Sequence, residues 1–178
     1  MDIRWLIALL PAVFMFHDFE ELVMFEPWLR KNRGEVRRRF PPIDAVLARW
    51  HDGLSTPAYA VAVMHEFAIV AVITYGSLYV DSYGWWFGAF AAFSLHLLIH
   101  IAQWLIYRKY VPFVLTSILA LPYCGYTLMG FLSVTSLSLT ELVLWCILGV
   151  LLTLASFPSA FALAARFERW KNASYLSG

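Results

Sequence analysis

The sequence predicts an all-α protein, a polytopic membrane helix bundle of five transmembrane helices. Hydrophobic residues make up 61% of its 178 positions and charged residues only 14%, against about 25% charged residues in ordinary soluble domains. The apolar residues fall in long runs of the ~20 residues that cross a bilayer as a helix. Twelve of the thirteen Lys and Arg residues gather in three clusters at the ends of these runs, which is typical of membrane topology and argues against nucleic-acid binding.

Each predicted span is defined by its apolar length. In chain order the spans are residues 3–28, 57–79, 85–107, 112–134 and 139–167. The first lacks the small-residue cleavage site of a signal peptide and is expected to remain as a span. The last is long enough to tilt or to extend past the interface. Since no repeat, linker or second domain is visible, residues 1–178 are expected to form a single membrane domain.

The positions of the basic residues predict the orientation. The second and fourth connections hold no basic residue. The clustered basic residues are Arg30, Lys31, Arg33, Arg37, Arg38, Arg39 and Arg49 in the first connection, Arg108 and Lys109 in the third, and Arg166, Arg169 and Lys171 in the tail. By the positive-inside rule, the N-terminus lies outside and the C-terminus in the cytoplasm. The basic segment 30–51, broken by Pro41 and Pro42, is expected either to lie on the cytoplasmic membrane surface or to form a solvated loop.

Ionisable side chains interrupt the first three apolar runs without any accompanying Lys or Arg. They are His17, Asp18, Glu20 and Glu21 in the first run, His65 and Glu66 in the second, and His96 and His100 in the third. A charged group at the bilayer centre costs roughly 2.5–3.5 kcal/mol on insertion scales and is a functional hypothesis by default. A proton, a histidinium or a metal ion must neutralise these carboxylates, and four neighbouring histidines favour the metal.

Helix geometry predicts that these side chains meet. At a rise of ~1.5 Å per residue, His17, His65 and His96 lie about 15–16 Å from the cytoplasmic ends of their helices. Glu20, Glu21 and His100 lie one turn nearer to the cytoplasm. The spacing of the polar residues within the first and third runs is i, i+3 or i+4, which places them on one face of each helix.

Seven of these residues are the predicted metal ligands: His17, Glu20, Glu21, His65, Glu66, His96 and His100. A set of this size suits two divalent ions, as in carboxylate-bridged bundles, with iron the first choice and zinc the second. Glu20 or Glu21 would act as a general base, while Asp18 and Gln103 would hold ligand ring N–H groups. The open alternatives are a structural polar network, proton or metal-ion translocation, and haem ligation by two of the histidines.

The remaining polar residues carry weaker signals. Tyr123 and Tyr126 reach a similar depth on the fourth span, where they are expected either to line a pocket or to serve only in helix packing. Cys124 and Cys146 lack any zinc-ligand or redox spacing and are expected to be small core residues. His51, in the basic segment, is expected to be solvated.

The string His17-Asp18-Phe19-Glu20-Glu21 resembles the defining motif of the HXXEE family of small bacterial membrane proteins. The later His65-Glu66 and His96-x-x-x-His100 are similar to further polar positions of that family, so the resemblance extends at least through the third span. The family has no established function. The resemblance therefore implies a shared membrane site without supplying a reaction.

These observations predict a membrane-embedded metalloenzyme that acts on a lipid or another hydrophobic small molecule, with redox chemistry favoured over zinc hydrolysis. The alternative is a proton or metal-ion transporter that uses the same histidines and carboxylates. HExxH, GxSxG and P-loop motifs are absent from the sequence, which argues against a zincin protease, a serine hydrolase and an NTPase. We expect a multi-pass protein of the bacterial plasma membrane, in contact with lipids and with no nucleic-acid partner, and a homo-oligomer is left open.

Overall fold

The computed structural model describes residues 2–50 and 52–175, and all of its regular structure over these residues is helical. The helices, in chain order, are α1 (Ile3–Ala8), α2 (Leu10–Arg39), α3 (Pro41–Trp50), α4 (Thr56–Val80), α5 (Gly84–Tyr107), α6 (Val114–Val134) and α7 (Leu139–Tyr175). The prediction of an all-α bundle is therefore confirmed. His51, which was expected to be solvated, lies outside the described residues.

Four of these helices, α4 to α7, are long and apolar enough to cross a membrane, so the chain is a multi-pass membrane protein. The predicted count was five. The difference lies in the first predicted span, which the structure divides between α1 and α2. Four carboxylates interrupt the apolar stretch of α2: Asp18, Glu20, Glu21 and Glu26. Because of these charges, α2 does not qualify as a membrane-spanning helix by length and composition alone.

The break between α1 and α2 has a local cause. Pro11 lies in the first turn of α2, and its ring leaves the preceding turn without one backbone donor. The hydroxyl of Tyr123, on α6, donates to the carbonyl oxygen of Leu6 at 2.8 Å. Tyr123 thus has a structural role at this break, whereas Tyr126 is exposed.

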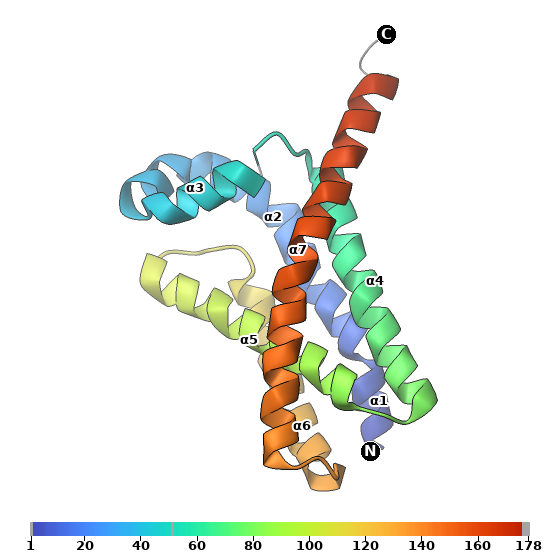
Figure 1. Ribbon diagram of the computed structural model, residues 1–178. Helices are drawn as coiled ribbons and strands as arrows, with labels where there is room; N and C mark the ends of the chain where they lie inside the picture. The colour runs from blue at the N-terminus through green and yellow to red at the C-terminus, as the bar shows by residue number, and fades with distance from the viewer. Residues whose placement is uncertain (1, 51, 176–178) are drawn as a thin grey trace.

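The helices form a bundle with the two chain ends at opposite poles (Figure 1). The long helix α7 runs along the bundle and packs most extensively against α5 and α4. The C-terminal half of α2 and the short helix α3 project together to one side, near the pole that holds the C-terminus. All three basic clusters belong to segments at or near that pole, and we call it the basic pole.

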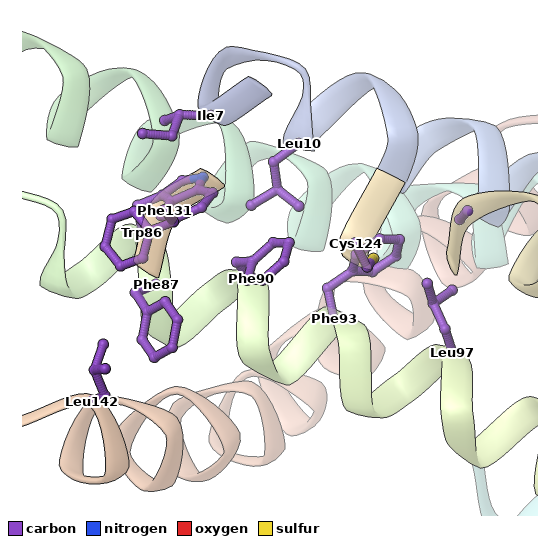
Figure 2. Close-up of a cluster of buried hydrophobic side chains, with 11 residues drawn as sticks. Ile7, Leu10, Trp86, Phe87, Phe90, Phe93, Leu97, Cys124, Phe131 and Leu142 are labelled. Atoms are coloured by element: carbon purple, nitrogen blue, oxygen red, sulfur yellow. The ribbon is translucent and has the colours of Figure 1, made fainter. Parts of the chain in front are cut away.

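An aromatic core packs α5 against α1, α2 and α6 in the half of the bundle nearer the N-terminus (Figure 2). Trp86 stacks on Phe90 with ring centroids 5.0 Å apart, and Phe87 stacks on Phe131 at 5.2 Å. Residues from α1, α2, α5, α6 and α7 contribute to this core. It lies between the N-terminal pole and the polar residues of the predicted site, and it excludes water along the side of α5 that packs against α1 and α6.

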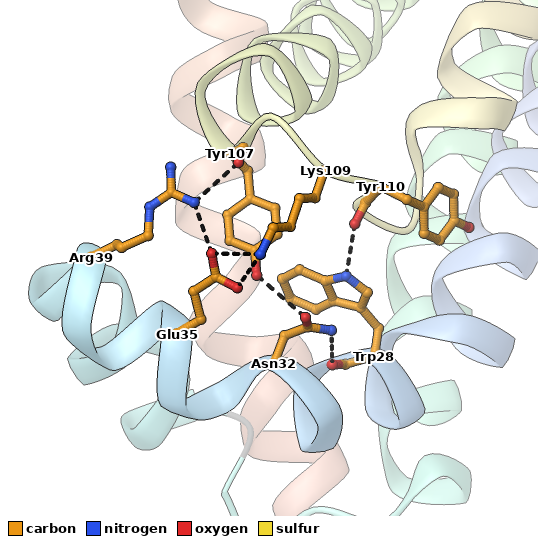
Figure 3. A network of polar contacts seen from close by, with 7 residues as sticks. All are labelled: Trp28, Asn32, Glu35, Arg39, Tyr107, Lys109 and Tyr110. Atoms are coloured by element: carbon orange, nitrogen blue, oxygen red, sulfur yellow. Dashed lines mark hydrogen bonds and ion pairs between the residues drawn. The ribbon is translucent and has the colours of Figure 1, made fainter.

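A polar network ties α2 to the end of α5 at the basic pole (Figure 3). The carboxylate of Glu35 accepts hydrogen bonds from Lys109 at 2.8 Å and from Arg39 at 2.9 Å. These two cations, Lys109 foremost, lower the pKa of Glu35 to about 2. Glu35 is therefore ionised at any physiological pH, and the network holds the two helices at a fixed separation.

The segment predicted to be interfacial is ordered as helix rather than loop. Asp44 of α3 accepts hydrogen bonds from Arg33 and Arg37 of α2, which folds α3 back against α2. Ile43 and Val46 of α3 are about half exposed. Charged contacts on one side and exposed apolar residues on the other suit a helix at the membrane surface.

Two glycines set the contact between α5 and α7. A Cβ atom built on Gly149 would lie 2.1 Å from the carbonyl oxygen of Gly88, and one built on Gly88 would lie 2.9 Å from that of Trp145. The helix backbones touch here, as small residues permit in membrane helix pairs. The Gly84–Gly88 spacing of the sequence thus marks a real crossing, with Gly149 as its partner.

The substitution Gly149→Ala should therefore destabilise the bundle, because the added methyl group forces α7 away from α5. We expect a loss of about 1–3 kcal/mol in the free energy of unfolding, measured by denaturant unfolding in detergent. Gly76→Ala is the matched control, since nothing lies within 4 Å of its Cβ position, and it should be neutral or slightly stabilising. Equal effects of the two substitutions would contradict the close crossing.

Candidate metal centre

Four of the seven predicted ligands come together between α2 and α5. They are His17 and Glu21 from α2 and His96 and His100 from α5. Each offers one ligand atom, and these four atoms lie within 4.8 Å of one another. We call this set the His/Glu group. Ligand atoms in a tetrahedral site with bonds of about 2.0–2.1 Å lie about 3.3–3.4 Å apart, so the widest pairs of the group must approach by up to about 1.4 Å to hold one ion.

The three imidazole rings of the group are in mutual contact. Ring centroids lie 5.2 Å apart for His17 and His96, 5.2 Å for His17 and His100, and 4.2 Å for His96 and His100. The Nε2 atoms of His96 and His100 are 2.9 Å apart. Two such nitrogens either share a proton or bind the same cation, and adjacent ligands on one ion are separated by about 2.9–3.4 Å.

The ring of His17 is completely buried and is held by one nitrogen. Its Nδ1 lies 3.1 Å from the hydroxyl of Thr116, on α6. Its Nε2 is buried without any hydrogen-bond partner among the described residues. A buried polar atom without a partner is costly, and here the atom belongs to a group that could bind a cation.

Glu20 fixes the Nδ1 atom of His17 through Thr116. The hydroxyl of Thr116 donates to Oε2 of Glu20 at 2.6 Å, so this hydroxyl is left to accept the Nδ1 proton of His17. The backbone N–H of Thr116 and the hydroxyl of Tyr110 also donate to Glu20, at 2.9 and 2.8 Å. Glu20 was predicted as a ligand and as a general base. The structure instead places it as the anchor of a Glu20–Thr116–His17 chain, an arrangement that orients metal-binding histidines.

His100 is held in the same manner. Its Nδ1 lies 2.9 Å from Oε1 of Gln103, one helical turn away, which leaves Nε2 facing the group. The expected supporting role of Gln103 therefore matches the contact observed. Sequence reasoning missed Thr116, because a threonine within an apolar run carries no charge and no motif.

Glu21 joins the group to a tyrosine on α4. The hydroxyl of Tyr59 donates to Oε1 of Glu21 at 2.5 Å, and this contact occupies only one of the two carboxylate oxygens. Nothing in the sequence drew attention to Tyr59. Its position follows only from the packing of α2 against α4.

His65 and Glu66 lie elsewhere in the bundle, where they connect α4 to α7. His65 lies 3.2 Å from the hydroxyl of Ser159 through Nε2 and 3.2 Å from Glu66 through Nδ1. The hydroxyl of Ser156 donates to Glu66 at 2.8 Å. His65 is thus supplied with partners outside the His/Glu group, whereas Glu66 also lines the cavity described next.

A cavity of about 630 Å³ opens beside the His/Glu group, among α2, α4, α5 and α7, with Val46 of α3 also in its wall. Its walls are mostly apolar, but Glu21 and His96 of the group line it, as do Asp18 and Glu66. A second cavity, of about 230 Å³, lies toward the basic pole. Glu21 and Tyr59 line both spaces, so the Tyr59–Glu21 hydrogen bond lies where they adjoin.

The fold and the site define a multi-pass membrane protein that carries a buried His/Glu group between two of its helices. A family model described as a protein of unknown function with an HXXEE motif matches residues 8–127, and the chain belongs to this family. No curated protein and no solved structure matches it. The motif residues now have positions: His17 and Glu21 belong to the group, and Glu20 anchors His17 through Thr116.

Substitutions in the His/Glu group should lower the metal content of the purified protein. His17→Ala and His96→Ala each remove a ligand and leave a carboxylate to be neutralised in a low-dielectric layer. Metal per chain, measured by mass spectrometry, should fall sharply in both. Thr116→Val keeps the ligands but releases His17, and it should weaken metal affinity by roughly 10- to 100-fold.

His65→Ala is the matched control, because the same residue type is removed from α4 without touching the group. Its metal content should equal that of the unmodified protein. Loss of metal in His65→Ala with retention in His17→Ala would show that the ligands have been assigned wrongly.

Proposed function

We propose that this chain is a membrane-embedded metalloenzyme that acts on a lipid or another hydrophobic molecule. One observation carries the proposal: Glu21 and His96 belong both to the four-residue His/Glu group and to the wall of the apolar cavity. A molecule in that cavity would contact the group directly. Small-molecule sites are commonly concave, largely apolar and equipped with a few convergent polar groups.

The donor set suits iron or zinc, because imidazole and carboxylate ligands serve both. With iron, the site would support oxidative chemistry, and with zinc it would activate a water molecule for hydrolysis. We favour iron. The group of four suffices for one ion, and Asp18 and Glu66, which line the same cavity, are the carboxylates available for a second.

The chain's own residues divide the remaining work. Thr116 and Gln103 fix the tautomers of His17 and His100, so that Nε2 of each ring faces the group. The carboxylate of Glu21 receives a hydrogen bond from Tyr59, and this pair is placed to take up or release a proton beside the cavity. The role of general base, expected of Glu20 or Glu21, is assigned to Glu21, since both oxygens of Glu20 accept other hydrogen bonds.

We also propose five crossings, with α1 and the first half of α2 forming one span, the N-terminus outside and the basic pole in the cytoplasm. The two chain ends lie at opposite poles (Figure 1), as an odd number of crossings requires. Arg4, the one basic residue outside the three clusters, is bound to Asp81 at 2.9 Å and to the carbonyl of Leu78 at 3.0 Å. A bacterial plasma membrane is the setting that this orientation and the family suggest.

Reporter fusions test the orientation. Fusions after Arg38 and at the C-terminus should both report a cytoplasmic location, and a fusion at Asp81 should report an external one, because basic connections remain inside. Opposite results at Arg38 and at the C-terminus would mean an even number of crossings and would refute the proposed span formed by α1 and α2.

The second candidate is a proton or metal-ion transporter built on the same residues, since polar side chains across a membrane often form ion pathways. A pathway needs polar groups along its whole length. In the half of the bundle nearer the N-terminus, the aromatic core of Figure 2 packs α5 against α1 and α6, and the cavity beside α4 and α7 is lined there by apolar residues and glycines. This favours a site that opens to the cytoplasmic side or to the bilayer over one that connects two faces.

Metal content and flux separate the two candidates. In proteoliposomes that contain the purified chain, we expect bound metal but no transmembrane flux of iron, zinc or protons above protein-free vesicles. Two irons per chain would support redox chemistry and one zinc would support hydrolysis. A flux that His17→Ala abolishes would overturn the enzyme proposal in favour of transport.

A further inference from the structure

The shape of the large cavity limits what can enter it. On α5 its wall runs from Trp85 past Ala89 and Ala92 to His96 and, beyond the His/Glu group, reaches Gln103. The twelve residues from Trp85 to His96 span eleven helical rises, or about 16 Å at ~1.5 Å per residue. α4 and α7 line the cavity beside α5, and its apolar length extends from the His/Glu group toward the N-terminal pole.

The far end of the cavity is flanked by bulky residues and by a tight helix crossing. Trp85 and Trp145 both line it, and their rings meet edge to face with centroids 5.0 Å apart. Close by, Gly88 and Gly149 bring α5 and α7 into backbone contact, so no chain can pass between these helices at that level. An extended alkyl tail that starts at the group would end at the two indole rings.

The near end of the cavity is polar and acidic. Asp18, Glu21 and Glu66 line the large cavity, and Glu21, Glu26 and Asp52 line the small one. Two cations face the small cavity. Arg33 is bound by Asp44 and Asp52, and Arg30 lies 3.6 Å from Glu26. Five carboxylates line the two cavities against two paired guanidiniums, so this end stays net negative even with one divalent ion in the His/Glu group. It therefore disfavours a phosphate or carboxylate, because like charges repel strongly in a low-dielectric site.

We propose that the large cavity binds a single-chain amphiphile whose head group is neutral or cationic, such as a long-chain alcohol or amine. The head lies at the Tyr59–Glu21 pair, and the tail extends to Trp85 and Trp145. The inference rests on the proposed function, since it names the substrate class of the same site. It further assigns Ala89 and Ala92 as residues that determine chain length, because their small side chains leave room for the tail.

Photolabelling tests this assignment. The full-length chain, in phosphatidylcholine nanodiscs, is incubated with tetradecanol carrying a diazirine at its terminal carbon, and labelled residues are identified by mass spectrometry. We expect saturable labelling at Trp85, Trp145 or Leu148, reduced at least tenfold by excess unlabelled tetradecanol. The matching tetradecanoic acid probe should label these positions at least tenfold less.

Two variants test the length limit. Ala89→Phe fills the middle of the cavity and should abolish labelling by the tetradecanol probe at Trp145 while leaving labelling by a short octanol probe on the near side. Ala102→Phe places the same side chain on an exposed part of α5 and should change nothing. If Ala89→Phe fails to fold, Leu148→Trp narrows the same cavity from α7.

The outcomes that would contradict the inference can be distinguished from one another. Labelling that is unsaturable and equally strong at Leu119, an exposed residue of α6, would show bulk lipid contact and overturn the inference. Equal labelling by the acid probe would overturn the choice of head group. Metal content is measured on the same samples. Bound metal without specific labelling would refute the proposed amphiphile and leave the metalloenzyme proposal standing. Specific labelling without bound metal would refute the metalloenzyme proposal and leave the amphiphile-binding site standing.

Discussion

Neutralisation of carboxylates within an apolar bundle is the constraint on which the arrangement of this protein depends. α2 carries Asp18, Glu20 and Glu21 without a single Lys or Arg at that depth, and an unpaired charge there is strongly unfavourable. Each carboxylate is given a different environment. Glu20 is saturated by donors from Thr116 and Tyr110, Glu21 shares a proton-bearing contact with Tyr59 and faces three imidazoles, and Asp18 faces the cavity. α4, α5 and α6 each supply a partner, so the packing of these helices around α2 follows from its polar residues.

The sequence predicted the helices well and the site in part. Apolar runs located α4, α5 and α6 to within two residues at each end, because transmembrane length and the loss of backbone hydrogen bonding in lipid define such helices. α7 continues as helix to Tyr175, eight residues beyond the predicted span, since helix propensity persists after hydropathy ends. Depth and helical spacing placed His17, Glu21, His96 and His100 together, as observed. The same reasoning included His65, which lies at a suitable depth but faces Ser159 on α7. The depth of a residue in the membrane can be predicted from the sequence, but the rotation of a helix about its own axis depends on its packing against neighbouring helices.

This arrangement gives a physical explanation for the spacing of the HXXEE motif. Its first and last residues are four positions apart on one helical face, and both turn toward α5. Its middle carboxylate does not compete for the same place, because Thr116 draws it toward α6. A helix can therefore present a histidine and a carboxylate to one side and still hold that histidine's other nitrogen through a neighbouring helix. The motif is short because α5 supplies the other two members of the group.

The crossing of Gly88 and Gly149 has a consequence for how the protein is made. All four members of the His/Glu group lie in α2 and α5, and their supporting residues Tyr59, Gln103 and Thr116 lie in α4, α5 and α6. Every one of them precedes α7 in the chain and is synthesised before it. The group can thus assemble while the side of the bundle that α7 will cover is still open to the bilayer. α7 arrives last, docks through the glycine crossing and closes the apolar cavity over a centre that is already in place.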